Sequence, residues 1–177
     1  MSKYEELVQT FTNRQPLPPL KPENIWDDQL SQEIMNLTEQ DVTGTNNPSS
    51  LAVSATRAGL LLWNDDLYGS HTISQSIKEP VGSYWHGIMH RQEADYGNAK
   101  YWFSNVGEHE VYSSLYQEAI KLLPEIKAWG SWNPNLFIDL VEEEVSQNNE
   151  QSEKAEKLRQ IQAIEFALLL EYSRSIG

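Results

Sequence analysis

The sequence contains no cysteine. This absence excludes disulfide bonds, metal sites built on thiolates and catalysis by a cysteine nucleophile. A metal site in this chain would have to use nitrogen and oxygen ligands. A chain without disulfides suits the reducing cytosol, and we expect a cytoplasmic protein.

Long apolar runs are also missing. No stretch approaches the roughly 18 residues that signal a membrane-spanning helix, so we expect no transmembrane segment. The first residues, MSKYEELVQTF, lack the apolar run of a secretory signal peptide. We therefore expect no membrane partner.

Basic residues are few. Lysine and arginine total 13 against 26 aspartates and glutamates, and the formal net charge is −13. Binding to nucleic acid or to an anionic membrane requires clustered basic side chains, so we expect neither. Many of the acidic residues lie between positions 139 and 156, a pattern typical of a solvated helix face and linker.

The chain is nevertheless rich in core-forming residues. Apolar residues make up 39% and aromatic residues 10% of its 177 residues, with six tryptophans. This composition indicates one globular domain, residues 1–177, which can bury roughly two-thirds of the surface of its unfolded chain. Residues 15–22 (QPLPPLKP) cannot be helical and favour an extended arm. We expect this arm to lie over the domain surface; the alternative is a ligand for a proline-binding partner.

The hydrophobic spacing predicts helices throughout, and we find no strand alternation and no internal repeat. We predict an all-α fold, a single-domain array of about seven helices. Ser2 and Glu5 have capping-box spacing, and Asn133-Pro134 combines an N-cap with proline at the first helical position. Residues 38–50 are expected to form a loop. The expected helical ranges are 2–13, 25–36, 51–78, 83–94, 96–105, 108–123, a helix from 134, and 153–175.

Reactive side chains are concentrated between Gly82 and His109, a segment that contains three of the four histidines. At about 100° per residue, His86, His90 and Glu93 share one narrow helical face. Two histidines four positions apart can hold one metal ion from a single helix. We therefore expect a divalent transition metal, with Zn, Fe, Mn and Ni as candidates. Glu93 is the expected third ligand, and a fourth is expected from Glu165, Asp66 or His71. The expected outer partners are Asp95, Asn98 and Gln75.

Two other helical ranges carry polar residues where an apolar stripe is expected. Glu165 falls in the middle of the stripe of the last helix, where a carboxylate must be paired, ligated or protonated. In the range 51–78 the stripe meets Asp65 and Asp66. Either this helix emerges into solvent or bends at Gly69, or three helices direct polar groups toward one buried centre. We expect the second arrangement.

Two alternatives to a metal site remain open. A buried Glu93 or Glu165 with a raised pKa would exchange protons with a histidine, while Arg91 and Lys100 hold an anionic small molecule. Alternatively, the histidines and acids form a structural hydrogen-bond network in a non-enzymatic interaction or scaffold domain. The residues expected to line a ligand pocket are Trp85, Arg91, Asp95, Asn98 and Lys100.

Trp129 and Trp132 flank a Gly-Ser turn. We expect them at the surface, where they would pack against a second copy in a homodimer. The alternative is a loop that folds back onto the core.

The segment from residue 82 to 107, with its YWHGIMHR and NAKYWF text, resembles a family of uncharacterised microbial proteins. The resemblance extends upstream over residues 58–77 (AGLLLWNDD, SHTISQSI) and downstream over residues 161–173 (IQAIEFALLLEYS). It implies no reaction. The residues that it implies act as one constellation are His71, His86, His90, Glu93, Asp95, Asn98 and Glu165.

Overall fold

A computed structural model describes residues 1–177, and all of its regular elements are helices. The all-α prediction is confirmed, but there are eleven helices instead of about seven, because two short helices form in expected loops and one expected helix is divided. The helices are α1 (Lys3–Asn13), α2 (Asp28–Asn36), α3 (Glu39–Thr43), α4 (Ser50–Trp63), α5 (Leu67–Ser74), α6 (Pro80–Gln92), α7 (Tyr96–Ser104), α8 (Val111–Leu122), the 3-10 helix η1 (Pro124–Trp129), α9 (Pro134–Ser146) and α10 (Glu153–Ser175).

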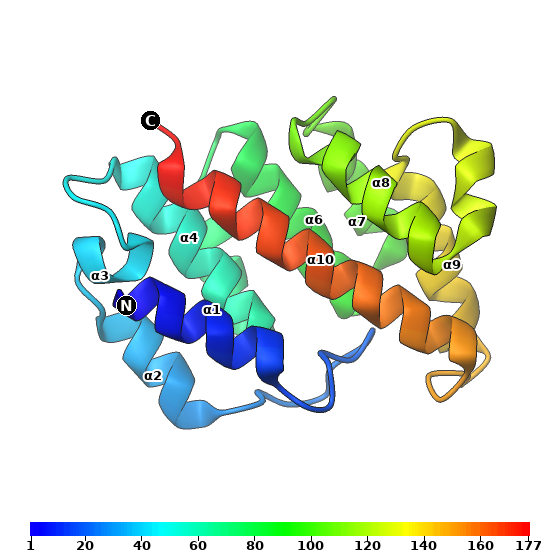
Figure 1. The fold of residues 1–177 in the computed structure, drawn as a ribbon, viewed down its shortest axis with the longest axis horizontal. Coiled ribbons are helices and arrows are strands. Elements are labelled where there is room, and N and C mark those ends of the chain that lie inside the picture. Colours follow the sequence, from blue (N-terminus) through cyan, green and yellow to red (C-terminus); the bar gives the residue numbers. More distant parts are fainter.

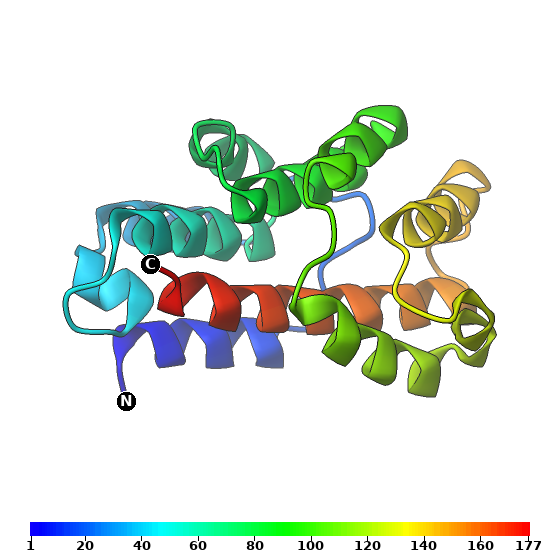
Figure 2. The same ribbon diagram turned by 90° about the horizontal axis from the view of Figure 1, so that it is seen from above.

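The longest helix, α10, runs along the whole molecule (Figure 1). At one end it lies between α4 and α1, and at the other end between α9 and α8 (Figure 2). Helices α5, α6 and α7 form a further layer on the α4 side. No helix combines the length and the apolar composition that crossing a membrane would require.

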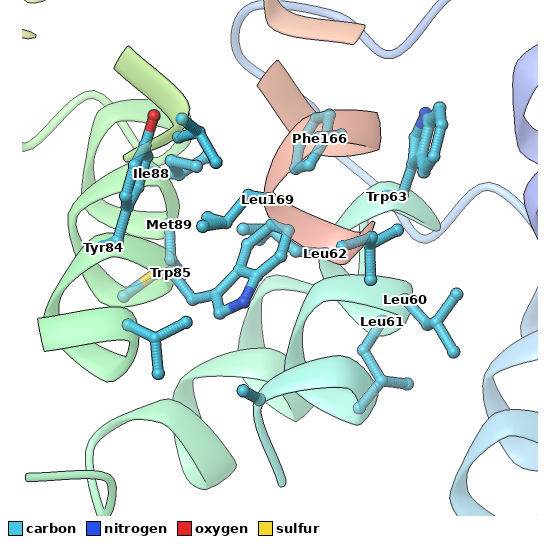
Figure 3. Close-up of a cluster of buried hydrophobic side chains, with 14 of the residues drawn as sticks. Leu60, Leu61, Leu62, Trp63, Tyr84, Trp85, Ile88, Met89, Phe166 and Leu169 are labelled. Atoms are coloured by element: carbon cyan, nitrogen blue, oxygen red, sulfur yellow. The ribbon is translucent and has the colours of Figure 1, made fainter. Parts of the chain in front are cut away.

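The main hydrophobic core lies where α4, α6 and α10 meet (Figure 3). The ring of Phe166 is stacked with Trp63 at a centroid distance of 5.7 Å and with Trp85 at 6.0 Å. Gly59 of α4 allows this approach, because a Cβ atom there would overlap the Trp85 indole. The core therefore fixes α6 against the two helices beneath it.

A second core lies between α8, α9 and α10. The proline-rich arm contributes to it through Leu20, which is fully buried. The Leu20 amide donates a hydrogen bond to Glu150 Oε1 (3.0 Å), and Gln162 Nε2 donates to the Pro19 carbonyl (3.3 Å). Residues 15–22 thus lie against α10, as the surface-arm interpretation expects.

The expected helix 51–78 is divided into α4 and α5 by a turn at residues 64–66. Asp65 adopts a left-handed conformation (φ 61°), and its carboxylate is paired with the buried Arg14 at 2.9 Å. Asp66 caps α5 by accepting a hydrogen bond from the Gly69 amide (2.9 Å). The polar residues in this stretch therefore end one helix and begin the next, a role that the helical periodicity does not reveal.

Other boundaries also differ from expectation. The helix expected at 83–94 begins three residues earlier because Pro80 starts α6 instead of breaking it. The expected loop 38–50 contains α3, which Thr38 caps and Gly44 ends with φ 66°. The capping box of Ser2 and the Asn133 cap are confirmed.

Two successive helix pairs, α4–α5 and α6–α7, share one turn geometry. The left-handed residue is Asp65 in the first turn and Ala94 (φ 64°) in the second. The next residue caps the following helix in both cases, through Asp66 and Asp95. Each cap amide also donates a hydrogen bond five residues back, at 3.0 Å to Leu61 and 2.9 Å to His90. The same turn, with a left-handed residue followed by an aspartate cap, thus joins both helix pairs.

Candidate metal centre

Three histidines from two helices meet at one point. His86 and His90 lie on α6, one turn apart, and His71 lies on α5, which the turn at residues 64–66 places beside α6. One ring nitrogen from each of the three lies within 4.8 Å of the others. The expected grouping of His86 and His90 with His71 is therefore present in the structure.

The rings pack closely against one another. His86 and His90 are stacked at a centroid distance of 4.6 Å and an interplanar angle of 24°. His71 meets His86 edge-on at 4.7 Å and 82°. The indole of Trp102, from α7, is stacked on the His86 ring at 3.9 Å and 20°. Ring contacts, with no hydrogen bonds to its nitrogens, thus set the orientation of His86.

His86 is the most buried member of the cluster, with 3% of its surface exposed. Neither of its ring nitrogens has a hydrogen-bond partner within the protein. Burial, reinforced by the neighbouring His90 and His71, lowers the pKa of His86 to about 4. The imidazole is therefore neutral at physiological pH. One of its two nitrogens carries a lone pair that it can donate to a Lewis acid.

His90 is held by a carboxylate. Its Nδ1 lies 2.6 Å from Glu93 Oε1, so with Glu93 ionised the ring donates its Nδ1–H and keeps a lone pair on Nε2. The Asn98 side-chain nitrogen lies 3.2 Å from Nε2 and 3.5 Å from Nδ1. A carboxylate behind an imidazole is the arrangement that orients histidine ligands in metal sites.

Glu93 and Asp95 form a second, more exposed group with His90, whose ligand atoms also lie within 4.8 Å of one another. Asp95 is already engaged as the cap of α7, where its Oδ1 accepts a hydrogen bond from the backbone N–H of Asn98 at 3.3 Å. Asp66 has the same capping role for α5. These acids therefore shape the helices around the histidines.

The histidine cluster opens into a cleft of about 410 Å³. Tyr68 stands at this cleft with 83% of its surface exposed. His71, His90 and Glu93 were expected at a site from the sequence, whereas Leu67, Tyr68 and Met89 were not, because only the folding of α5 against α6 brings them together. The lining residues are Leu67, Tyr68, His71, Met89, His90 and Glu93.

Glu165 belongs to a different polar cluster. Its Oε1 accepts a hydrogen bond from Arg91 Nη2 at 2.6 Å, and its Oε2 accepts one from the Tyr84 hydroxyl at 3.0 Å. Burial, with the nearby Glu165 carboxylate, raises the pKa of Tyr84 well above its ordinary value. The expected single polar centre is therefore two centres on different sides of α6, and Glu165 is paired instead of joining the histidines.

The remaining expected ligand-pocket residues are dispersed. Trp85 is fully buried in the main core, and its Nε1 donates to Ser173 Oγ at 3.0 Å. Lys100 forms an exposed ion pair with Asp139 at 2.6 Å. Neither side chain reaches the cleft beside the histidines.

The surface tryptophans expected for a homodimer are not at the surface. Trp132 is buried, with 6% of its surface exposed, and contacts the Phe137 ring at 5.1 Å. Trp129 is partly buried and packs against Trp132 at 5.6 Å. The loop folds back onto the second core, which removes the observation on which the dimer expectation rested.

The fold and the site define an all-helical protein with a buried three-histidine cluster beside an open cleft. No protein-family model, curated protein or solved structure matches the chain. The function must therefore be inferred from the geometry of the site itself.

Proposed function

We propose that the protein binds one divalent transition-metal ion through His71, His86 and His90. The observation that carries the proposal is the state of His86, which is buried while both of its ring nitrogens lack a partner in the protein. Buried polar atoms are nearly always hydrogen-bonded or ligated, so such a ring calls for a partner. A metal ion between the three histidines would supply one.

The donor set indicates which metals fit. Three neutral imidazoles suit Zn, Fe or Ni better than Mn, which prefers carboxylate ligands. Two nitrogens bound to one tetrahedral zinc ion lie about 3.3 Å apart. The three ring nitrogens lie within 4.8 Å of one another, a range that includes this separation.

In this proposal Glu93 orients His90 and is not itself a ligand. Its Oε1 is engaged with His90 Nδ1 at 2.6 Å, and it does not join the group formed by His71 and His86. The ion would take the Nε2 lone pair of His90, in place of the Asn98 Nδ2 group that lies 3.2 Å from it. This differs from the sequence expectation that Glu93 coordinates directly.

A metal-free structural network in a non-enzymatic domain is the second candidate. The stacking of His86 on Trp102 and the bond between His90 and Glu93 favour it, because both contacts hold α6 against neighbouring structure. It leaves the two His86 nitrogens unsatisfied, which favours the metal site over the network.

Metal analysis of protein purified without an affinity tag, before and after incubation with Zn²⁺, Fe²⁺ or Ni²⁺, tests the proposal. We expect one equivalent in the wild type and none in the His86→Phe variant, which keeps a ring to stack on Trp102. His109→Phe is the matched control, since His109 is the only histidine outside the cluster. Retention of metal by His86→Phe, or no uptake by the wild type, would overturn the metal site and leave the structural network.

A further inference from the structure

We infer that the bound metal ion keeps one coordination position open to the cleft, and that this position takes a small ligand with a single donor group and an apolar body. This inference rests on the metal site proposed above and names the class of molecule that the site would bind. Three observations carry it: the number of protein donors, the lining of the cleft and the absence of basic side chains from that lining.

The protein offers three donors and no fourth at the same point. His86 closes the buried side of the cluster beneath Trp102, while His71 and His90 line the cleft. Glu93, the nearest carboxylate, is occupied by His90. Structural zinc sites fill four positions with protein atoms, whereas sites that act on other molecules keep one position free. The free position here faces the cleft, because the other directions are occupied by the histidine rings and Trp102.

The walls of the cleft indicate what lies beyond the donor atom. Leu67 and Tyr68 of α5 and Met89 of α6 give it apolar surface. The ring of Tyr68, one turn before His71 on α5, is 83% exposed and is available to cover an apolar group. A cleft of about 410 Å³ lies within the size range of small-molecule sites, which combine apolar walls with few polar groups.

The charges around the cleft limit the donor group. No lysine or arginine lines the cleft. Arg91 of α6 and Lys100 of α7 are engaged in other ion pairs, with Glu165 and with Asp139. Glu93 adds a negative charge at the edge. A phosphate ester would therefore be bound by the metal ion without help from lysine or arginine, the side chains that usually bind such multiply charged groups.

The test uses the Co²⁺-loaded full chain, whose visible absorption changes when a ligand enters the metal's coordination shell. The probes are acetate, butyrate and hexanoate, which share one donor group and differ in apolar length, and inorganic phosphate. We expect the affinity to rise by up to about fourfold for each methylene that enters the cleft. Phosphate should bind more weakly than hexanoate.

Variants locate the apolar contact. Leu67→Ala should weaken hexanoate binding severalfold and leave acetate binding unchanged. Leu136→Ala is the matched control, because Leu136 is a partly exposed leucine on α9 that does not line the cleft. Equal effects of the two substitutions would place the apolar body elsewhere and overturn the inference.

The outcomes separate the two proposals. If Co²⁺ does not bind, the metal site itself is wrong and the inference falls with it. If Co²⁺ binds but none of the probes changes its absorption, the metal site stands and the open position is wrong. If acetate and hexanoate bind equally, or phosphate binds most tightly, the position is open but the assigned class of ligand is wrong.

Discussion

The two polar clusters of α6 differ in how their buried groups are compensated. Arg91 and Glu165 are each 1% exposed as side chains, their opposite charges meet at 2.6 Å, and neither lines the cleft beside the histidines. The guanidinium also lies 4.8 Å from the centre of the Phe137 ring. Arg91 Nε and Nη1 lack hydrogen-bond partners, as both His86 ring nitrogens do, but the charge of Arg91 is paired, and only the histidine cluster opens to the cleft lined by His71 and His90. The first cluster therefore joins α6 to α10, whereas the second is the one to which we assign a ligand.

The largest expected effect comes from breaking the Arg91–Glu165 pair. Arg91→Met leaves the Glu165 carboxylate buried without a counter-charge, and we expect it to lower the free energy of unfolding by about 3–5 kcal/mol. The double variant Arg91→Met, Glu165→Met should recover much of this loss. Denaturation in urea measures both.

The exposed pair of Lys100 and Asp139 provides the control for this prediction. Lys100→Met removes the same type of charge from a pair with a similar separation of 2.6 Å, but solvent screens it. We expect a loss of less than about 1 kcal/mol. If Arg91→Met were no more damaging than Lys100→Met, the structural role of the first cluster would be wrong.

Metal binding should stabilise the protein through the histidine cluster and should not depend on the pair of Arg91 and Glu165. At a free Zn²⁺ concentration about a hundredfold above Kd, we expect the free energy of unfolding of the wild type to rise by about 2.7 kcal/mol. The double variant at Arg91 and Glu165 should show the same rise, while His86→Phe should show none. Thermal or urea unfolding with and without a chelator measures the difference, and a Zn²⁺ response in His86→Phe would argue against the assigned ligands.

The sequence predicts single helices better than it predicts their partners. The Ser2 capping box and the bounds of α10 depend on neighbouring residues and were found correctly. The polar residue Glu165 was recognised as buried because the helical period places it in an apolar stripe. Its pairing with Arg91 depends on how α6 is rotated against α10, and no local spacing contains that information.

The histidine cluster also could be predicted only in part from local spacing. His86 and His90 are grouped by the helical period, but the approach of His71 depends on a turn whose left-handed residue is Asp65. A non-glycine residue in that conformation is uncommon, and the sequence gives little warning of it. The expectation of a continuous helix there was wrong for this reason.

Acid should weaken the metal-free protein through the second cluster. The pKa of His86 is about 4 in the folded state against 6.5 for the unfolded chain, so the unfolded chain takes up the proton first as the pH falls. The contribution of neutral His86 to stability is complete above pH 6.5 and is lost between pH 6.5 and 4. At about 1.4 kcal/mol per unit of pKa difference, we expect this loss to reach about 2 kcal/mol at about pH 5.

Unfolding measured across this pH range in the presence of a chelator isolates the effect, when the wild type is compared with His86→Phe. The two proteins differ only at His86, so the difference reports the titration of His86 together with its coupling to the neighbouring histidines. A difference that does not depend on pH would show that His86 titrates normally, and would remove the contrast with the pair of Arg91 and Glu165.

The smallest expected effect concerns Trp102, whose indole is the neighbour that faces the His86 ring at 3.9 Å. Trp102→Leu removes an aromatic contact that is worth about 0.5–1.5 kcal/mol, and we expect a metal affinity up to about tenfold lower. Trp102→Phe should restore most of that affinity, since a ring again orients His86. Metal titrations of the three proteins test this order. Equal affinities would mean that the other histidines alone hold the His86 ring, and that the stacking contributes only to the packing of α7 on α6.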